Sequence, residues 1–317
     1  MEERALRVLE FHQFLQTLKA YSSSEVGQAL CLSLRPSQAI GEVETLLREV
    51  AAASDILREE GDVPLEGLQE VRPLLACARA EGACLLPEEL LPLRSTLAGA
   101  ERAKQFLRHP GERHALMKQW AEEIPEFRDL HGALCSALGP RGEILDSASP
   151  ELRQIRKEIS RIRGRIRNAL EALWEQENFR KIFQEQIITL RNDRYVVAVK
   201  AESKNTLPGI IHDQSQSKAT YFIEPFSTVE ENNELNLLLK DEKEEERRIL
   251  LALTAGVREQ SDRIAKAVKV LGRLDLVFAK ANGQGHPGEP SLCSTMRATG
   301  TCGMLGIPFW KANPQCP

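Results

Sequence analysis

The sequence predicts a mainly α-helical protein, in which a helical bundle is joined to a long antiparallel helical arm bearing a small antiparallel β module. Three observations predict this fold class. Only 5% of the 317 residues are aromatic, and Leu, Ala, Glu and Arg, which lose little rotamer freedom in a helix, are abundant. Two long apolar seams recur at helical spacing, and a short β-rich stretch lies between them. At this length we expect about two domains.

Residues 1–145 are expected to form the helical bundle. Apolar residues recur at spacings of three and four from Ile40 to Leu57, and again from Leu90 to Leu107. Prolines fall between such runs or at their start, where a missing amide hydrogen does least harm. We therefore expect several helices with short connections.

Residues 146–281 are expected to form the arm. Ser149, Pro150 and an acidic residue directly after them are typical of a helix start, because the hydroxyl caps free amides and the carboxylate faces the positive end of the dipole. From Leu152 an apolar seam continues for about three heptads, as in a coiled-coil strand. We expect this helix to continue to Phe183.

A β module is expected at about residues 186–225. The β-rich runs Ile187 to Leu190 and Tyr195 to Lys200 are separated by residues that suit a tight hairpin. Two further runs, PGIIHDQ and KATYFIE, are joined by a short polar segment. These four runs predict a small antiparallel sheet of about four strands, after which a second seam from Leu250 to Leu274 predicts the returning arm helix.

Residues 282–317 are expected to form an irregular tail. From residue 283 onward the chain has six Gly, five Pro and three Cys, without periodicity. Such a segment is typical of a linker or an interaction tail. The alternative is the end of a truncated or frame-shifted gene.

Charge is distributed unevenly along the chain. The net charge is −4, yet residues 151–220 carry +5 and residues 224–248 carry −5. A basic arm on an acidic body can attract a phosphate backbone locally. Because hairpin turns can reach a backbone or a groove, the best candidates for phosphate contacts are the five cations of the β module. These are Arg191, Arg194, Lys200, Lys204 and Lys218.

Other charged and aromatic residues have simpler interpretations. Seven cations of the first arm helix can pair with the acidic returning helix on a solvated surface. Tyr195 and Tyr221 alternate with apolar neighbours, which favours core packing over base stacking. The seven cations are Arg153, Arg156, Lys157, Arg161, Arg163, Arg165 and Arg167.

No catalytic or metal-binding motif is found. His212 and Asp213 are adjacent, so a strand places them on opposite faces and they cannot form a simple dyad. The sequence has no nucleophile elbow, HExxH, phosphate-binding GxxxxGK[ST] or glycine-containing metal loop. Its seven cysteines lie far apart without a CxxC pair, which predicts reduced thiols. We expect no catalytic residue, cofactor or metal in this chain.

The first residues, MEERALRVLEFHQF, carry charges where a signal peptide needs an apolar core. No run approaches the ~18 apolar residues of a membrane span. We therefore expect a cytoplasmic protein that has no membrane partner.

Several blocks of the sequence resemble the second MutS-type family of bacteria, which is associated with suppression of recombination and with rescue of collided ribosomes. The resemblance extends from LEFHQFL near the start to Ala281. The blocks are GEILDSASPELRQIRKEI, TLRNDRYVVAVKAE, PGIIHDQSQSKATYFIEP, VEENNEL and LDLVFAKA.

The resemblance implies a MutS-like core and lever of helices, a clamp module on the arm, and mismatched or branched DNA as the ligand. It also implies a homodimer, an ATPase domain that binds ATP and Mg²⁺, and an endonuclease domain. No position of this chain matches the motifs of those two domains. We expect a truncated N-terminal region that is not catalytic by itself, although the family consists of enzymes.

Three functions stay open at this point. The first is a DNA-binding clamp whose five sheet cations hold phosphates without reading sequence. The second is a ribosome-binding collision sensor that uses the same cations on rRNA. The third is an inert structural fragment in which the arm charges pair only with one another.

Overall fold

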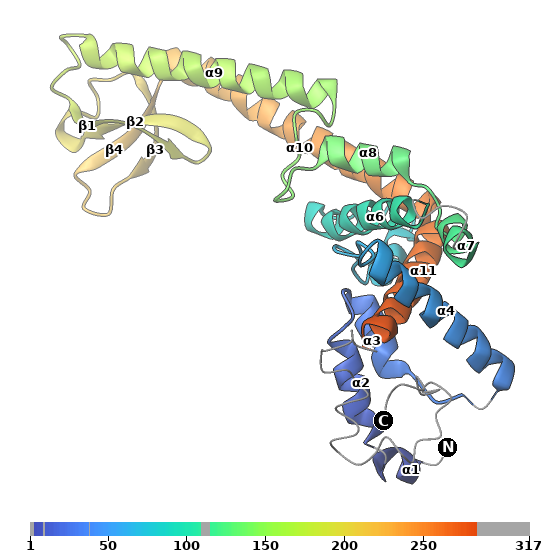
Figure 1. Cartoon of the computed structure of the whole chain (residues 1–317). Coiled ribbons are helices and arrows are strands. Elements are labelled where there is room, and N and C mark those ends of the chain that lie inside the picture. The colour runs from blue at the N-terminus through green and yellow to red at the C-terminus, as the bar shows by residue number, and fades with distance from the viewer. Residues whose placement is uncertain (1–2, 9, 38, 109–114, 284–317) are drawn as a thin grey trace. The chain divides into compact units, whose positions relative to one another are not determined.

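The computed structural model describes residues 3–8, 10–37, 39–108 and 115–283 (Figure 1). Within these ranges there are eleven α-helices and one four-stranded antiparallel sheet, so the predicted mainly helical fold with a small β module is confirmed. The expected tail lies outside the described residues from residue 284 onward. None of the helices in the described ranges combines the length and the apolarity that a membrane span needs.

The chain divides into two compact units, Met1–Glu143 with Leu251–Pro317, and Ile144–Leu250. The sequence ranges 1–145 and 146–281 had grouped residues 251–281 with the arm, whereas the contacts group them with the first unit.

The first unit is helical and is organised around α11. Helix α11 packs against α3, α4 and α6, and it buries Ile264, Leu271 and Phe278. The core of the unit therefore lies along the last described helix. Its helices are α1 (Glu3–Val8), α2 (Phe11–Lys19), α3 (Glu25–Ser33), α4 (Ile40–Glu59), α5 (Arg72–Ala78), α6 (Pro87–Arg108), α7 (Ala115–Glu123), α8 (Arg128–Ala137) and α11 (Ser261–Asn282).

Asp275 of α11 anchors the start of α3. Its buried carboxylate accepts hydrogen bonds from the backbone amides of Ser23 and Ser24, each at 2.9 Å, and from the Ser22 hydroxyl at 2.7 Å. These amides lie at a helix N-terminus, where they would otherwise lack partners and where a negative charge is favoured by the dipole. The contact fixes α3 on α11.

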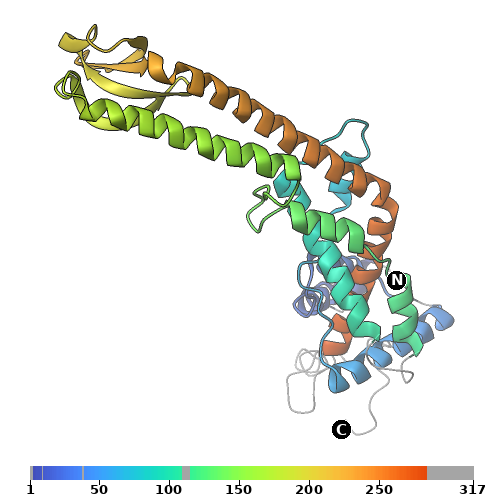
Figure 2. The same cartoon turned by 90° about the horizontal axis from the view of Figure 1, so that it is seen from above.

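The second unit contains α9 (Pro150–Glu175) and the first part of α10 (Val229–Glu259). Helix α9 begins as predicted, because the Ser149 hydroxyl accepts a hydrogen bond from the Leu152 amide at 2.9 Å. It ends at Glu175, so the expected continuation to Phe183 is wrong. The backbone turns to an extended conformation at Gln176, and Phe183 begins strand β1. The two helices lie side by side in antiparallel directions (Figure 2).

The sheet of this unit has the order β1-β2-β4-β3, and all neighbouring strands are antiparallel. The predicted tight hairpin joins β1 to β2 through Asn192 and Asp193. Their φ angles of 52° and 60° are the positive values that a two-residue type I′ turn requires. The strands are β1 (Phe183–Arg191), β2 (Arg194–Lys200), β3 (Gly209–Gln214) and β4 (Thr220–Pro225). A short 3₁₀ turn follows β2 at Ala201–Ser203, and another follows β4 at Phe226–Thr228.

One face of the sheet packs on the apolar seam of α9. Val197, Val199 and Ile223 join Ile162 and Ile166 in one buried cluster. Tyr195 and Tyr221 pack against the same cluster, as their alternation with apolar neighbours predicted. The sheet is therefore held on the arm helix through every second residue of its central strands.

Candidate nucleic-acid interface

Arg156 of α9 is fully engaged by carboxylates. Its guanidinium donates to Glu242 and Glu246 of α10, each at 2.8 Å, and to Asp146 at 2.7 Å. Burial alone would lower the pKa of Arg156, but hydrogen bonds to the three carboxylates outweigh burial and hold this pKa above its ordinary value. This cation joins the two helices and is not available to a ligand.

Only part of the remaining charge on α9 is paired in the same way. Arg165 binds Glu234 of α10 at 2.7 Å, and Arg161 binds Glu158 within α9 at 2.7 Å. The predicted pairing with the acidic helix thus holds for Arg156 and Arg165. The other four cations of this helix are exposed and make no ion pair with any described residue. These are Arg153, Lys157, Arg163 and Arg167.

The five predicted phosphate contacts of the sheet fall at its two opposite ends. Arg191 pairs in register with Arg194, next to the β1–β2 turn, and we call this the arginine end. Lys200 pairs in register with Thr220 at the other end of the same strands. We call that the lysine end, and it contains Lys200, Lys204 and Lys218.

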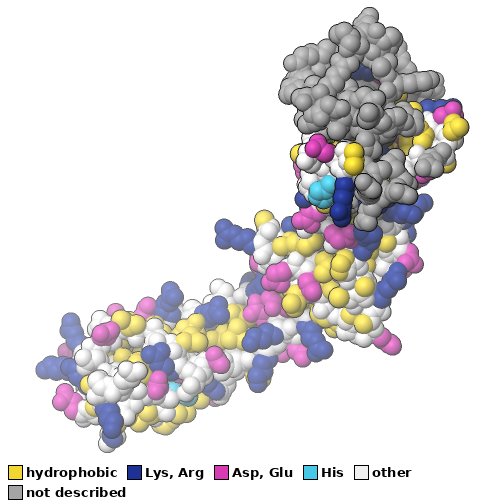
Figure 3. All heavy atoms as spheres, turned by 90° about the horizontal axis from the view of Figure 1, so that it is seen from below, with side chains coloured by type: hydrophobic (Ala, Val, Ile, Leu, Met, Phe, Trp, Pro, Cys, Tyr) yellow, Lys and Arg dark blue, Asp and Glu magenta, His cyan; other side chains and the backbone are white. Residues whose placement is uncertain are grey.

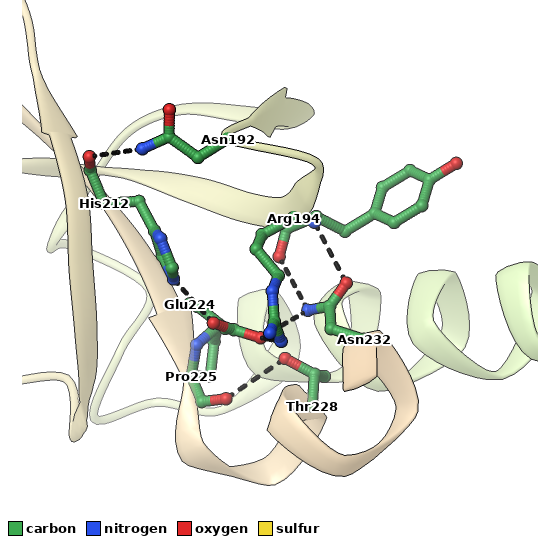
Figure 4. Close-up of polar contacts among 8 residues, drawn as sticks. Asn192, Arg194, His212, Glu224, Pro225, Thr228 and Asn232 are labelled. Atoms are coloured by element: carbon green, nitrogen blue, oxygen red, sulfur yellow. Dashed lines mark hydrogen bonds and ion pairs between the residues drawn. The ribbon is translucent and has the colours of Figure 1, made fainter. Parts of the chain in front are cut away.

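At the arginine end, Glu224 is the centre of a buried polar cluster (Figure 4). Only 1% of its side chain is exposed. Its Oε1 accepts from Arg194 Nη1 at 3.1 Å and from Asn232 Nδ2 at 2.8 Å, and its Oε2 lies 2.6 Å from His212 Nε2. One carboxylate of β4 therefore holds side chains from β2, β3 and α10.

Asn232 ties the first turn of α10 to strand β2. Its Oδ1 accepts from the Tyr195 amide at 3.0 Å, and its Nδ2 donates to the Tyr195 carbonyl at 3.2 Å. The Thr228 hydroxyl donates to the Pro225 carbonyl at 3.1 Å just before the helix begins. Glu224 and Asn232 were not among the residues predicted from the sequence. The one available signal was a charged residue inside the otherwise β-forming run Thr220–Pro225.

Arg191 is also committed to contacts within the sheet. Its Nε lies 3.2 Å from Asp213 Oδ2, and its Nη1 donates to the Leu190 carbonyl at 2.8 Å. Its guanidinium carbon is 4.2 Å from the centroid of the Phe222 ring. His212 and Asp213 thus bind different partners, Glu224 and Arg191.

At the lysine end the cations have no carboxylate partner among the described residues. Lys200 Nζ donates to the Lys181 carbonyl at 3.2 Å, and Lys204 Nζ lies 5.3 Å from the centroid of the Tyr221 ring. Lys218 is exposed in the β3–β4 turn with a φ of 58°. Figure 3 shows Lys and Arg side chains projecting around the sheet-bearing end of this unit, with Asp and Glu side chains between them.

Potential metal ligands and thiols are scattered over the described part of the chain. There, no three His, Cys, Asp or Glu side chains are grouped to hold a metal ion. Cys31, Cys77, Cys84 and Cys135 are free thiols, and the remaining cysteines lie outside the described residues. Burial, with a contribution from Asp275, raises the pKa of Cys31 to about 11.

Fold and site together define a mainly helical protein with a four-stranded sheet that exposes cations at one end. No family model matches the chain. It is 36% identical over 281 residues to Endonuclease MutS2 of Pelotomaculum thermopropionicum, and 38% identical over 284 residues to Endonuclease MutS2 of Geobacillus thermodenitrificans. It is 36% identical over 285 residues to Putative endonuclease MutS2 of Bacillus subtilis.

Each of these matches covers 89% of this chain and 36% of the relative, so the chain spans about a third of the length of the curated relatives it matches. Over most of its length the chain is therefore similar to one part of proteins named Endonuclease MutS2.

Proposed function

We propose that the second unit is a nucleic-acid-binding module of a MutS-type DNA repair or recombination-control protein. It would hold the phosphate backbone of branched or duplex DNA without reading the base sequence. The observation that carries the proposal is the set of exposed cations on α9 and the sheet that have no carboxylate partner among the described residues. Such cations release counterions from DNA when they neutralise phosphates, and this release drives non-specific binding.

The relatives are named endonucleases. We propose endonuclease activity for a longer protein that contains this chain, and not for the described residues. ATP and Mg²⁺ binding and homodimerisation are proposed on the same terms. The described residues offer no carboxylate or histidine group that fits a metal ion. A cytoplasmic location is part of the same proposal.

The proposal predicts salt-dependent binding of the full chain to DNA. We would measure the anisotropy of fluorescent duplex and four-way-junction DNA between 50 and 200 mM salt. We expect the logarithm of the binding constant to fall linearly with the logarithm of salt concentration, because each neutralised phosphate contributes a slope of about −0.9.

Parallel sedimentation with ribosomes separates the alternatives. Binding to ribosomes without binding to DNA would show that the DNA assignment is wrong and would favour rRNA as the ligand. If neither ligand shows a salt-dependent affinity, these cations do not form a binding surface and the binding proposal fails.

A further inference from the structure

Two cations outside the five predicted phosphate contacts lie beside the lysine end. Arg180 and Lys181 precede strand β1, and both side chains are exposed without an ion pair to any described residue. Together with the three cations of the lysine end they form a group that we call the lysine patch. Its members are Arg180, Lys181, Lys200, Lys204 and Lys218.

Backbone hydrogen bonds hold the first half of this patch together. The Lys200 amide donates to the Ile182 carbonyl at 2.9 Å, and the Lys200 ammonium donates to the Lys181 carbonyl at 3.2 Å. The segment before β1 is therefore fixed against the end of β2. Lys181 lies next to Lys200 as a consequence of this pairing, and Arg180 directly precedes it in the chain.

The second half is brought close by the strand that follows. The Ala201 amide donates to the Ala219 carbonyl at 2.9 Å, directly beside Lys218. Lys204 lies over Tyr221, which pairs in register with Val199 of β2. Three chain segments that are separate in the sequence thus place their cations at one end of the sheet.

We infer that the lysine patch is the part of the sheet that contacts the sugar-phosphate backbone of duplex DNA, and that Arg191 and Arg194 hold the sheet together instead. This inference rests on the proposed function and assigns it to particular residues. The arginine end has its positive charge opposed by Asp213 and Glu224, at 3.2 and 3.1 Å. The lysine patch has no such partners among the described residues.

The chemistry of the patch fits a polyanion. Ammonium groups act as point charges that bind phosphate without a fixed geometry, which suits a backbone contact that carries no sequence information. Ser217 in the same turn as Lys218 is exposed and can donate a hydroxyl to a phosphate oxygen. Glu202, an exposed acidic residue, lies in the chain between Lys200 and Lys204. Its single negative charge is smaller than the charge of the five cations, so the patch has a net positive charge.

The test compares three variants of the full chain on the same fluorescent duplex. The patch variant is K181Q/K204Q/K218Q. The matched control is K118Q/K266Q/K269Q, which removes the same charge from exposed lysines of the first unit. The arginine-end variant is R191Q/R194Q, with R191Q alone as the substitute if the double variant does not fold.

We expect the patch variant to lower the salt slope by about 3 and to weaken binding roughly 100-fold at 0.15 M salt, because three phosphate contacts are lost. The control and the arginine-end variant should keep the slope of the unchanged chain. Circular dichroism and thermal unfolding should show the patch variant folded as before, since its three side chains are exposed.

An unchanged slope in the patch variant overturns the inference while the proposed function stands. So does an equal loss of slope in a folded arginine-end variant or in the control. If the unchanged chain binds ribosomes but not duplex DNA, the assignment of the patch to DNA is wrong. If it binds neither ligand, both the inference and the proposed function fail.

Discussion

At the arginine end of the sheet two cations lie against carboxylates, whereas at the lysine end three cations have no carboxylate partner among the described residues. Arg194 is 23% exposed and binds Glu224, which is 1% exposed. Lys204 and Lys218 are exposed. Cations of equal formal charge therefore differ in their availability to a ligand. A cation already paired in a buried site must break that pair before it can bind a phosphate, whereas an unpaired cation can bind directly.

The difference has its origin in the side chains that reach each end of the sheet. At the arginine end, Asp213 of β3 contacts Arg191 and Glu224 of β4 contacts Arg194, and the first turn of α10 adds Asn232. At the lysine end the neighbouring segments are the chain before β1 and the β3–β4 turn. These segments contribute further cations. A count of Lys and Arg along the sequence cannot separate the two situations.

The largest effect is expected from Glu224→Ala. The substitution leaves Arg194 and the Asn232 amide without their acceptor in a buried site, so the free energy of unfolding of the second unit should fall by about 3 kcal/mol. Urea unfolding followed by the fluorescence of Trp174, which packs against Phe183, would measure the change. The other tryptophans are replaced by Phe in this background.

The matched control for this prediction is Glu202→Ala at the lysine end. This glutamate is exposed and makes no ion pair with a described residue, so its removal should change the free energy of unfolding by less than about 0.5 kcal/mol. Equal losses in the two variants would remove the distinction between the two ends.

Much of the arm could be predicted from local sequence. The helix start at Ser149 and the hairpin turn at Asn192 and Asp193 follow from side chains that act on their own backbone. The end of α9 could not be predicted in the same way. Ile182 and Phe183 continue an apolar pattern compatible with a helix, but they are buried in the cluster below the sheet, and this tertiary packing decides their conformation.

The candidate site was predictable only in its residue types. Arg194 and Glu224 are 30 positions apart, and Asn232 and Tyr195 are 37 positions apart. Their contacts depend on the register of β2 with β4 and on the place where α10 begins. No short-range sequence pattern predicts the strand register or the residue at which α10 begins. The positive charge of the sheet could therefore be identified from the sequence, but its division into paired and unpaired cations could not.

A smaller effect is expected from Asn232→Ala. The change removes two hydrogen bonds to the Tyr195 backbone and one to Glu224, and it leaves buried polar groups unpaired. We expect a loss of about 2 kcal/mol in the free energy of unfolding. Compared with the unchanged chain, the variant should show a larger increase in the hydrogen-exchange rate at the Tyr195 amide than at the Val197 amide. Uniformly faster exchange across β2 would contradict a local role for Asn232.

The smallest effects on the free energy of unfolding are expected from substitutions of one cation at each end of the sheet. Arg191→Gln removes the contact with Asp213 and the stacking on Phe222, but the Arg191 side chain is 37% exposed, so the free energy of unfolding should fall by only about 1 kcal/mol. Lys218→Gln should change it by less than about 0.5 kcal/mol, because its side chain has no partner to lose among the described residues. Both values are measurable by urea unfolding of the single variants. A Lys218 variant less stable than the Arg191 variant would mean that the lysine end also uses its charge to hold the sheet, and its cations would then be poor candidates for binding phosphate.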